Sequence, residues 1–176
     1  MWTRLKDLLR RDYVRRAEET SRSTASSQST KSTFVTGAVS DSSGLSVRLE
    51  FKSKRDFEEF SLADERIQAI ALWTAWIMRR FWSYQAVVTS VMRTSAEQTA
   101  LYKKGLTKLK ISPHMVGRAI DIRLKDMPEK ERHVPILLEK INSKWPRSDG
   151  HRTAMAHGEG ANRHLHIQVP AQPREA

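Results

Sequence analysis

Two short stretches of the chain carry the residue types that bind a transition metal. The first contains His114 and Asp121, and the second, near the C-terminus, contains His164 and His166. Imidazole nitrogens and carboxylate oxygens are good zinc ligands, and a catalytic zinc site uses three protein ligands and keeps a fourth position for water. Because the chain has no cysteine, any metal must be held by His, Asp or Glu. These residues therefore predict a zinc site with hydrolytic chemistry.

Hydrophobic alternation predicts that each stretch includes a β-strand, because side chains alternate between the two faces of a strand. In the second stretch the core-facing residues are Leu165, Ile167 and Val169, and the residues on the other face are His164, His166 and Gln168. Over residues 118–124, Asp121 lies opposite three aliphatic residues, Ile120, Ile122 and Leu124. The spacing leaves open which strand histidine binds the metal and which acts on substrate.

The pattern Ser-x-His-x-x-Gly-x-Ala-x-Asp over residues 112–121, followed by a distant His-x-His, resembles the zinc peptidases of bacterial cell walls. That family comprises D-alanyl-D-alanine carboxypeptidases and the L-alanyl-D-glutamate endopeptidases of some phage lysins. It shares a metal-site plan with lysostaphin-type and hedgehog-like proteins. Residues 88–98 resemble the family's strand, arginine and helix start, and the whole resemblance covers roughly residues 60–170.

The resemblance implies an α+β fold, in which a small, mostly antiparallel sheet has helices packed on one side. It also implies zinc-dependent hydrolysis of a peptide bond in the peptidoglycan stem, by a carboxypeptidase or a phage-type endolysin. The implied zinc ligands are His114, Asp121 and His166. A non-catalytic zinc-binding module, serving as a wall-binding or phage structural protein, is the alternative. Activity that is lost on removing zinc and restored on adding it would separate the two.

One departure from the family concerns the general base. Many carboxypeptidases of the family carry Glu three residues before the last zinc ligand, where this chain has Arg163. The catalytic base is then predicted to be His164, or Glu159 from the preceding loop. Histidine is the side-chain type that commonly transfers protons near neutral pH, which suits His164 to this role.

Three further residues are candidate substrate-binding residues: Arg93, Ser112 and Gln98. Arg93 matches the family's substrate-anchoring arginine and could pair bidentately with a peptide carboxylate. Its alternative role is a surface salt bridge, and that of Ser112 is to shape its loop. The remaining histidines, His133, His151 and His157, are interpreted as surface residues.

The chain is strongly basic, with 31 Lys or Arg against 20 Asp or Glu and a net charge of +11. Such a charge suits an anionic partner, which could be nucleic acid, a membrane surface or an anionic wall polymer. No nucleic-acid-binding motif is present, so nucleic acid ranks last among these partners. The resemblance implies that the protein, expected to be a monomer, acts on the peptidoglycan peptide. Residues 1–16 lack the apolar run of a secretory signal. We therefore expect a protein that is cytoplasmic as made and reaches the wall after release or in a phage particle.

Composition and periodicity divide the chain into four parts. Residues 1–33 predict a basic amphipathic helix, packed on the domain or lying on an anionic surface, and a Ser/Thr-rich linker. Residues 34–60 predict a β-hairpin extension, residues 61–170 the zinc peptidase domain, and residues 171–176 a tail. Within the domain we expect helices over 62–82, 95–104 and 128–145, a strand over 85–92, and loops over 106–114 and 146–163. Asp64 and Ser95 are the expected N-caps of the first two helices, and Pro135 is expected to kink or divide the third.

Overall fold

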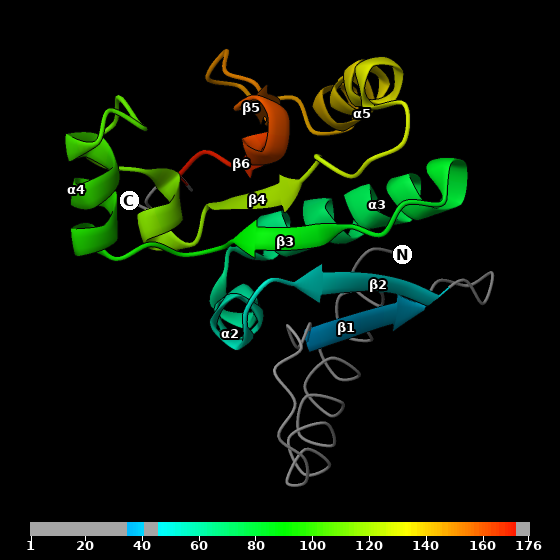
Figure 1. Ribbon diagram of the computed structural model, residues 1–176, viewed down its shortest axis with the longest axis horizontal. Coiled ribbons are helices and arrows are strands. Elements are labelled where there is room, and N and C mark those ends of the chain that lie inside the picture. Colours follow the sequence, from blue (N-terminus) through cyan, green and yellow to red (C-terminus); the bar gives the residue numbers. More distant parts are fainter. Residues whose placement is uncertain (1–34, 41–45, 172–176) are drawn as a thin grey trace, which may run out of the picture.

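The protein is seen here in a computed structural model that describes residues 35–40 and 46–171. The predicted N-terminal helix and linker, and residues 172–176 of the predicted tail, lie outside the described residues. One six-stranded sheet organises the described chain, with the strand order β1-β2-β3-β4-β6-β5 (Figure 1). Its strands are β1 (Val35–Ser40), β2 (Ser46–Phe51), β3 (Val87–Ser90), β4 (Ala119–Arg123), β5 (Ala154–His157) and β6 (His164–Gln168).

The sheet is mostly antiparallel, as the sequence predicts. Only β2 and β3 pair in parallel, and the other four pairings are antiparallel. The predicted hairpin is therefore joined to the rest of the sheet through β2. Leu49 and Phe51 of β2 are fully buried in the common core.

Helices cover one face of this sheet, which confirms the expected α+β class. The helices of the described chain are α2 (Lys54–Leu62), α3 (Glu65–Trp82), α4 (Ser95–Lys103) and α5 (Lys130–Lys144), with short 3-10 helices η1 (Pro113–Val116) and η2 (Gly160–Asn162). The longest, α3, contacts β2, β4 and β6, and α5 contacts α3 and β5. Phe51 of β2 packs its ring against Phe57 and Phe60 of α2.

The core lies between α3 and the sheet. Ile67, Ile70 and Met78 of α3 are almost completely buried, together with Ile120 and Ile122 of β4. Asp64 is the N-cap of α3, as predicted, and its carboxylate accepts the Arg66 backbone N–H. Truncating a buried isoleucine such as Ile67 to alanine would cost about 2–5 kcal/mol. Because residues alternate along β4, Asp121 lies on the sheet face that α3 does not cover.

Four local expectations need correction. The helix predicted over 62–82 is α3, which begins only at Glu65, and an additional helix, α2, occupies residues 54–62, within and just after the predicted hairpin segment. Thr94, rather than Ser95, caps α4, since Thr94 and Glu97 form a reciprocal capping box. The predicted third helix is one element, α5, so Pro135 does not divide it, and the predicted kink stays a prediction.

The fourth correction lies in the predicted loop over 146–163, which contains the edge strand β5. Its sequence, Ala-Met-Ala-His, is short and has no β-branched residue, so its local strand signal is weak. Antiparallel pairing with β6 stabilises the extended conformation that the local sequence favours only weakly. The Asn142 side chain also bonds both the N–H and the C=O of Ala154, at 2.9 and 3.0 Å.

Candidate metal centre

Strands β4 and β6 lie side by side, and their register brings the two predicted ligand stretches together. Asp121 is directly opposite His166, and Arg123 is opposite His164. His114 comes from η1, which leads into β4. Within the described residues, the group that could hold a metal ion comprises His114, Asp121 and His166.

The three ligand atoms have the spacing that one small ion requires. His166 Nδ1 lies 2.8 Å from Asp121 Oδ1 and 3.4 Å from His114 Nε2, and His114 Nε2 lies 3.3 Å from Asp121 Oδ1. In a tetrahedral zinc site with bonds of about 2.0–2.1 Å, neighbouring ligand atoms stand about 3.4 Å apart. The residues present therefore fit a single zinc ion without a large movement of the backbone.

His114 is held by the backbone on the side away from the other ligands. Its Nδ1 lies 2.8 Å from the Val91 carbonyl oxygen, so Nδ1 carries the proton and donates it to that oxygen. Nε2 then keeps its lone pair, as a metal ligand must. The Ser112 hydroxyl accepts the His114 backbone N–H at 3.4 Å and caps η1. Ser112 thus shapes the turn that presents His114.

Gly117 ends η1 with a backbone conformation that favours glycine. Its φ is +65°, and a Cβ at this position would lie 3.2 Å from the Cα of Ala63. Its carbonyl oxygen accepts the Asp64 N–H at 2.9 Å. The glycine of the sequence motif therefore lets η1 approach the start of α3 closely before the chain enters β4.

Asp121 is buried and divides its two carboxylate oxygens between different partners. Oδ1 faces His114 and His166, while Oδ2 accepts from Arg93 Nη2 at 2.7 Å. Burial raises the pKa of the Asp121 carboxyl, but hydrogen bonds from His114 and His166, together with their positive charge when both imidazoles are protonated, outweigh burial and hold that pKa well below its usual value. The carboxylate is therefore ionised, as a metal ligand must be.

His164 points its free ring nitrogen towards the same centre. Its Nδ1 lies 2.8 Å from the Asn162 carbonyl oxygen, which leaves Nε2 facing Asp121 Oδ1 at 3.8 Å. Its side chain is 31% exposed, whereas that of His114 is 1% exposed. The candidate ligand group contains His166 and leaves His164 beside it; the roles assigned to these two histidines stay predictions.

The other predicted site residues lie at different distances from this centre. Arg93 contacts it directly through Asp121. Gln98 is buried in α4, and its side-chain amide donates to the Leu109 carbonyl oxygen at 2.7 Å. Glu159 is exposed and, with Arg163 and Glu131 among others, lines a cavity of about 510 Å³ whose lining includes none of the three candidate ligands. The structure therefore brings Arg93 and Ser112 to the candidate ligands and does not bring Glu159 into that group.

His157, interpreted from the sequence as a surface histidine, is exposed but lies beside the site. It is opposite His164 in the β5–β6 register, and its ring centroid is 5.5 Å from that of His166. Burial lowers the pKa of His157, and the nearby imidazoles of His166 and His164 lower it further. The only signal in the sequence was the alternation of Met155 and His157 with two alanines, which barely distinguishes the two faces of a strand.

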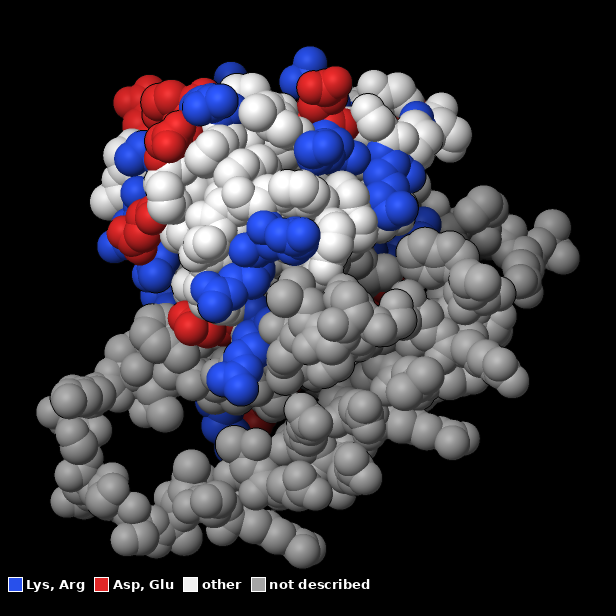
Figure 2. Space-filling model, turned by 90° about the vertical axis from the view of Figure 1, so that its right-hand side faces the viewer, with Lys and Arg blue, Asp and Glu red and all other residues white. Residues whose placement is uncertain are grey.

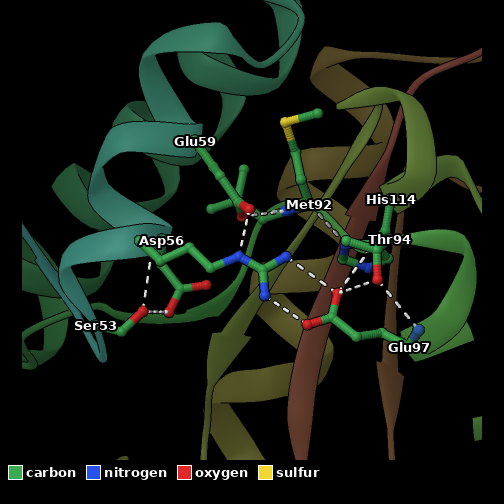
Figure 3. Close-up of polar contacts among 9 residues, drawn as sticks. Ser53, Asp56, Glu59, Met92, Thr94, Glu97 and His114 are labelled. Carbon is green, nitrogen blue, oxygen red and sulfur yellow. Dashed lines mark hydrogen bonds and ion pairs between the residues drawn. The ribbon is translucent and has the colours of Figure 1, made fainter. Parts of the chain in front are cut away.

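A brace from α2 holds the segment that carries Arg93 (Figure 3). Arg55 bonds Glu59 on its own helix and Glu97 on α4. The Glu59 carboxylate accepts the Met92 backbone N–H at 3.0 Å. Arg93 in turn donates its backbone N–H to the His114 carbonyl oxygen at 3.2 Å. The segment between β3 and α4 is therefore fixed from both sides, by the brace and by η1.

The fold and site together define an α+β protein with a candidate His-Asp-His metal centre on the open face of its sheet. No protein-family model and no curated protein sequence matches the chain. Among solved structures, the chain is similar to the crystal structure of the Serratia marcescens L-Ala D-Glu endopeptidase ChiX, at 13% sequence identity and a TM-score of 0.40. The match covers 67% of this chain and 90% of that one. No helix among the described residues is long and apolar enough to cross a membrane.

Proposed function

We propose that the protein is a zinc-dependent peptidase that hydrolyses a peptide bond in the stem peptide of peptidoglycan, as a carboxypeptidase or a phage-type endolysin. The observation that supports it most directly is the convergence of His114 Nε2, Asp121 Oδ1 and His166 Nδ1, with His164 Nε2 facing them. Two imidazoles and one carboxylate leave a coordination position open, which is the ligand pattern of hydrolytic rather than structural zinc sites.

The chemistry divides between the metal and the residues around it. A zinc ion held by His114, Asp121 and His166 would acidify a bound water and polarise the carbonyl of the scissile peptide bond. His164 would accept a proton at Nε2 and pass it to the leaving amine, since its Nδ1–H is committed to the Asn162 carbonyl oxygen. His164 is partly exposed and His114 is buried, which supports a substrate that approaches from the His164 side of the centre.

Arg93 would anchor the substrate while it orients a ligand. One guanidinium nitrogen, Nη2, already holds Asp121 Oδ2. A guanidinium has five N–H donors, so the others remain for a peptide carboxylate. The side chain is 22% exposed, which leaves it within reach of solvent on the open face. The peptidoglycan substrate itself is supported by the motif over residues 112–121, and the net charge of +11 suits an anionic wall.

The proposal is tested by incubating the purified full-length protein with peptidoglycan and identifying the released fragments by mass spectrometry. We expect stem-peptide cleavage that a chelator abolishes and added zinc restores. The His166→Ala variant should be inactive. The His151→Ala variant is the matched control, because His151 is exposed and lies outside the candidate ligand group. A zinc-loaded protein that releases no fragment from any wall preparation would contradict the proposal.

One observation favours a second candidate, a zinc-holding module that binds the wall without hydrolysing it. Arg163 occupies the position where the resembling carboxypeptidases carry Glu, and it forms an ion pair with Glu131 of α5. The candidate ligand group thus has Asp121 as its one carboxylate among the described residues. Zinc bound in equal amount to protein, with sedimentation on walls and no released fragment, would favour this second function.

A further inference from the structure

The segment from the end of α4 through η1 exposes aliphatic side chains to solvent. Leu106 is 71% exposed, Leu109 55% and Ile111 78%. Tyr102 at its start and Val116 at its end are also exposed. Isolated apolar residues are common on protein surfaces, but a group of them within one segment marks an interaction surface. We call residues 102–116 the basic-apolar loop.

The same loop is positively charged throughout. Between Glu97 and Asp121 the chain has five Lys or Arg residues and no acidic residue. The four lysines of the loop, Lys103, Lys104, Lys108 and Lys110, are exposed, and none forms an ion pair with another described residue. The face that includes the far end of α3 differs, because Lys and Arg side chains there are interspersed with Asp and Glu (Figure 2). A single-sign surface of this kind is complementary to an anionic partner.

Hydrogen bonds to its backbone hold the basic-apolar loop in place. Its aliphatic side chains therefore stay at the surface and do not fold back into the core. Buried Gln98 donates to the Leu109 carbonyl oxygen at 2.7 Å. Gly105 turns the chain out of α4 with a φ of +69°, and the Leu106 N–H bonds the Leu101 carbonyl oxygen at 3.0 Å. At the other end, Ser112 caps η1. The exposed aliphatic side chains are therefore presented on an anchored backbone.

We propose that the basic-apolar loop docks the protein on the surface of an anionic lipid bilayer. Leu106, Leu109 and Ile111 enter the boundary between headgroups and acyl chains, and the lysines contact lipid phosphates. Alternating lysine and aliphatic residues suit this boundary, because apolar burial and attraction to anionic lipid add together there. A soluble polyphosphate would engage the lysines and leave the aliphatic residues in water. Nucleic acid would favour stacking aromatics, of which the loop has only Tyr102.

Docking through this loop would bring the candidate metal centre close to the membrane. Ile111 is followed within three residues by His114, which is buried in η1. The proposal does not require hydrolytic activity, so binding and catalysis can be tested separately. It also assigns the membrane contact to the described domain, independently of the basic helix predicted within residues 1–33.

The test uses the full chain and vesicles of phosphatidylglycerol and phosphatidylcholine, with pure phosphatidylcholine vesicles for comparison, in a flotation assay. We expect binding to the anionic vesicles that weakens with salt. The double variant Leu106→Ser/Ile111→Ser should bind roughly tenfold more weakly or worse. Lys104→Gln/Lys108→Gln should lose roughly fivefold for each lysine. All variants should keep the circular dichroism spectrum of the wild type.

Matched controls come from the other side of the molecule. Phe81 is 57% exposed, near the end of α3 and roughly 25 Å along that helix from the contact between Asp64 and Gly117. Phe81→Ser should bind like the wild type, and so should Lys125→Gln/Lys140→Gln, which removes two exposed lysines. Equal losses in loop and control variants would show a general effect of charge or hydrophobicity and would overturn the proposal.

The absence of cysteine allows a direct measure of insertion. A polarity-sensitive fluorophore on Ile111→Cys should shift to shorter wavelength with anionic vesicles, and the same label on Phe81→Cys should not. Unchanged vesicle binding in the loop variants would place the contact elsewhere in the chain and overturn the proposal. So would loop-dependent binding to inorganic polyphosphate without any to vesicles, which would identify a wall polymer as the partner.

Discussion

His114 Nδ1 lies 2.8 Å from the carbonyl oxygen of Val91, at the end of the strand that precedes the site. This bond sets the tautomer of His114 and turns its Nε2 towards Asp121 and His166. A metal-binding imidazole commonly has such a partner on its second nitrogen, because the bond fixes the ring and raises its basicity. The same three side chains could instead form a hydrogen-bonded cluster around a buried carboxylate. Metal content is the measurement that distinguishes a metal site from such a cluster.

The wild-type protein should carry close to one zinc ion per chain by elemental analysis, and His114→Ala should lose most of it. The reason is that three protein ligands are the usual complement of a catalytic site, and losing one removes a third of them. His151→Ala should keep its zinc. At a free zinc concentration about 100 times the dissociation constant, the metal should also add about 2.7 kcal/mol to the free energy of unfolding. A wild-type protein that stays metal-free when supplied with zinc would contradict the proposed function.

His164→Ala should lower kcat by about 100-fold or more while zinc content stays near that of the wild type. The physical reason is that His164 Nε2 faces the centre, whereas its imidazole lies outside the candidate ligand group. Glu159→Ala should cost much less, since Glu159 is exposed and lines a cavity apart from the ligands. The measurements are steady-state kinetics on a soluble stem peptide and elemental analysis of each variant.

Two outcomes would revise these roles. An inactive Glu159→Ala beside an active His164→Ala would show that the loop before β6 moves in to supply the base. Loss of zinc from His164→Ala would instead exchange the ligand and catalytic roles of the two strand histidines.

The brace between α2 and α4 should give a measurable pH dependence to stability. The hydrogen bond from Arg55 is the largest cause that lowers the pKa of Glu97 from 4.5 to about 2. A carboxylate with a lowered pKa stabilises the fold above its unfolded pKa and loses that contribution as the pH falls through the folded value. Glu97→Gln should therefore lower the free energy of unfolding at pH 6, and its difference from the wild type should shrink between about pH 4.5 and pH 2.

Urea unfolding of both proteins across this range checks the prediction. Glu139→Gln is the control, because Glu139 is exposed on α5 and has no ion pair with another described residue. A Glu97→Gln difference that is the same at pH 6 and pH 3 would show that the brace contributes through packing and not through the ionised carboxylate.

Deleting residues 1–30 should leave zinc content and hydrolysis of a soluble stem peptide nearly intact. The candidate ligands, the brace and the core seen among the described residues all come from residues after this segment. Binding to intact walls should weaken if the basic residues of the segment contribute, and that loss should depend on salt. Thermal unfolding of the shortened protein is the measurement, and failure to fold would show that the N-terminal segment belongs to the core.

Local patterns predicted much of the fold and the chemistry. Alternation along β4 and β6 placed Ile120, Ile122, Leu165 and Ile167 on a buried face, because period-two burial is a property of each strand alone. The α+β class was implied by the resemblance of residues 60–170 to a known family. The capping carboxylate of Asp64 could likewise be read locally, as could the turn at Gly117. Residue type and spacing pointed to His114, Asp121 and the two strand histidines, and the family resemblance selected His166 as the third ligand; these roles await the experiments above.

Contacts between distant segments were decided by the tertiary structure alone. Arg55 and Glu97 are 42 residues apart, and no periodicity links them. Val91 meets His114, and His157 meets His166, only because of the order and register of β3, β4, β6 and β5. Strand order depends on how hydrophobic faces from the whole chain pack together, which a local window does not contain. The residue types by themselves therefore determined which chemistry was available, and the pairing of strands far apart in the chain decided which side chains face one another at the centre.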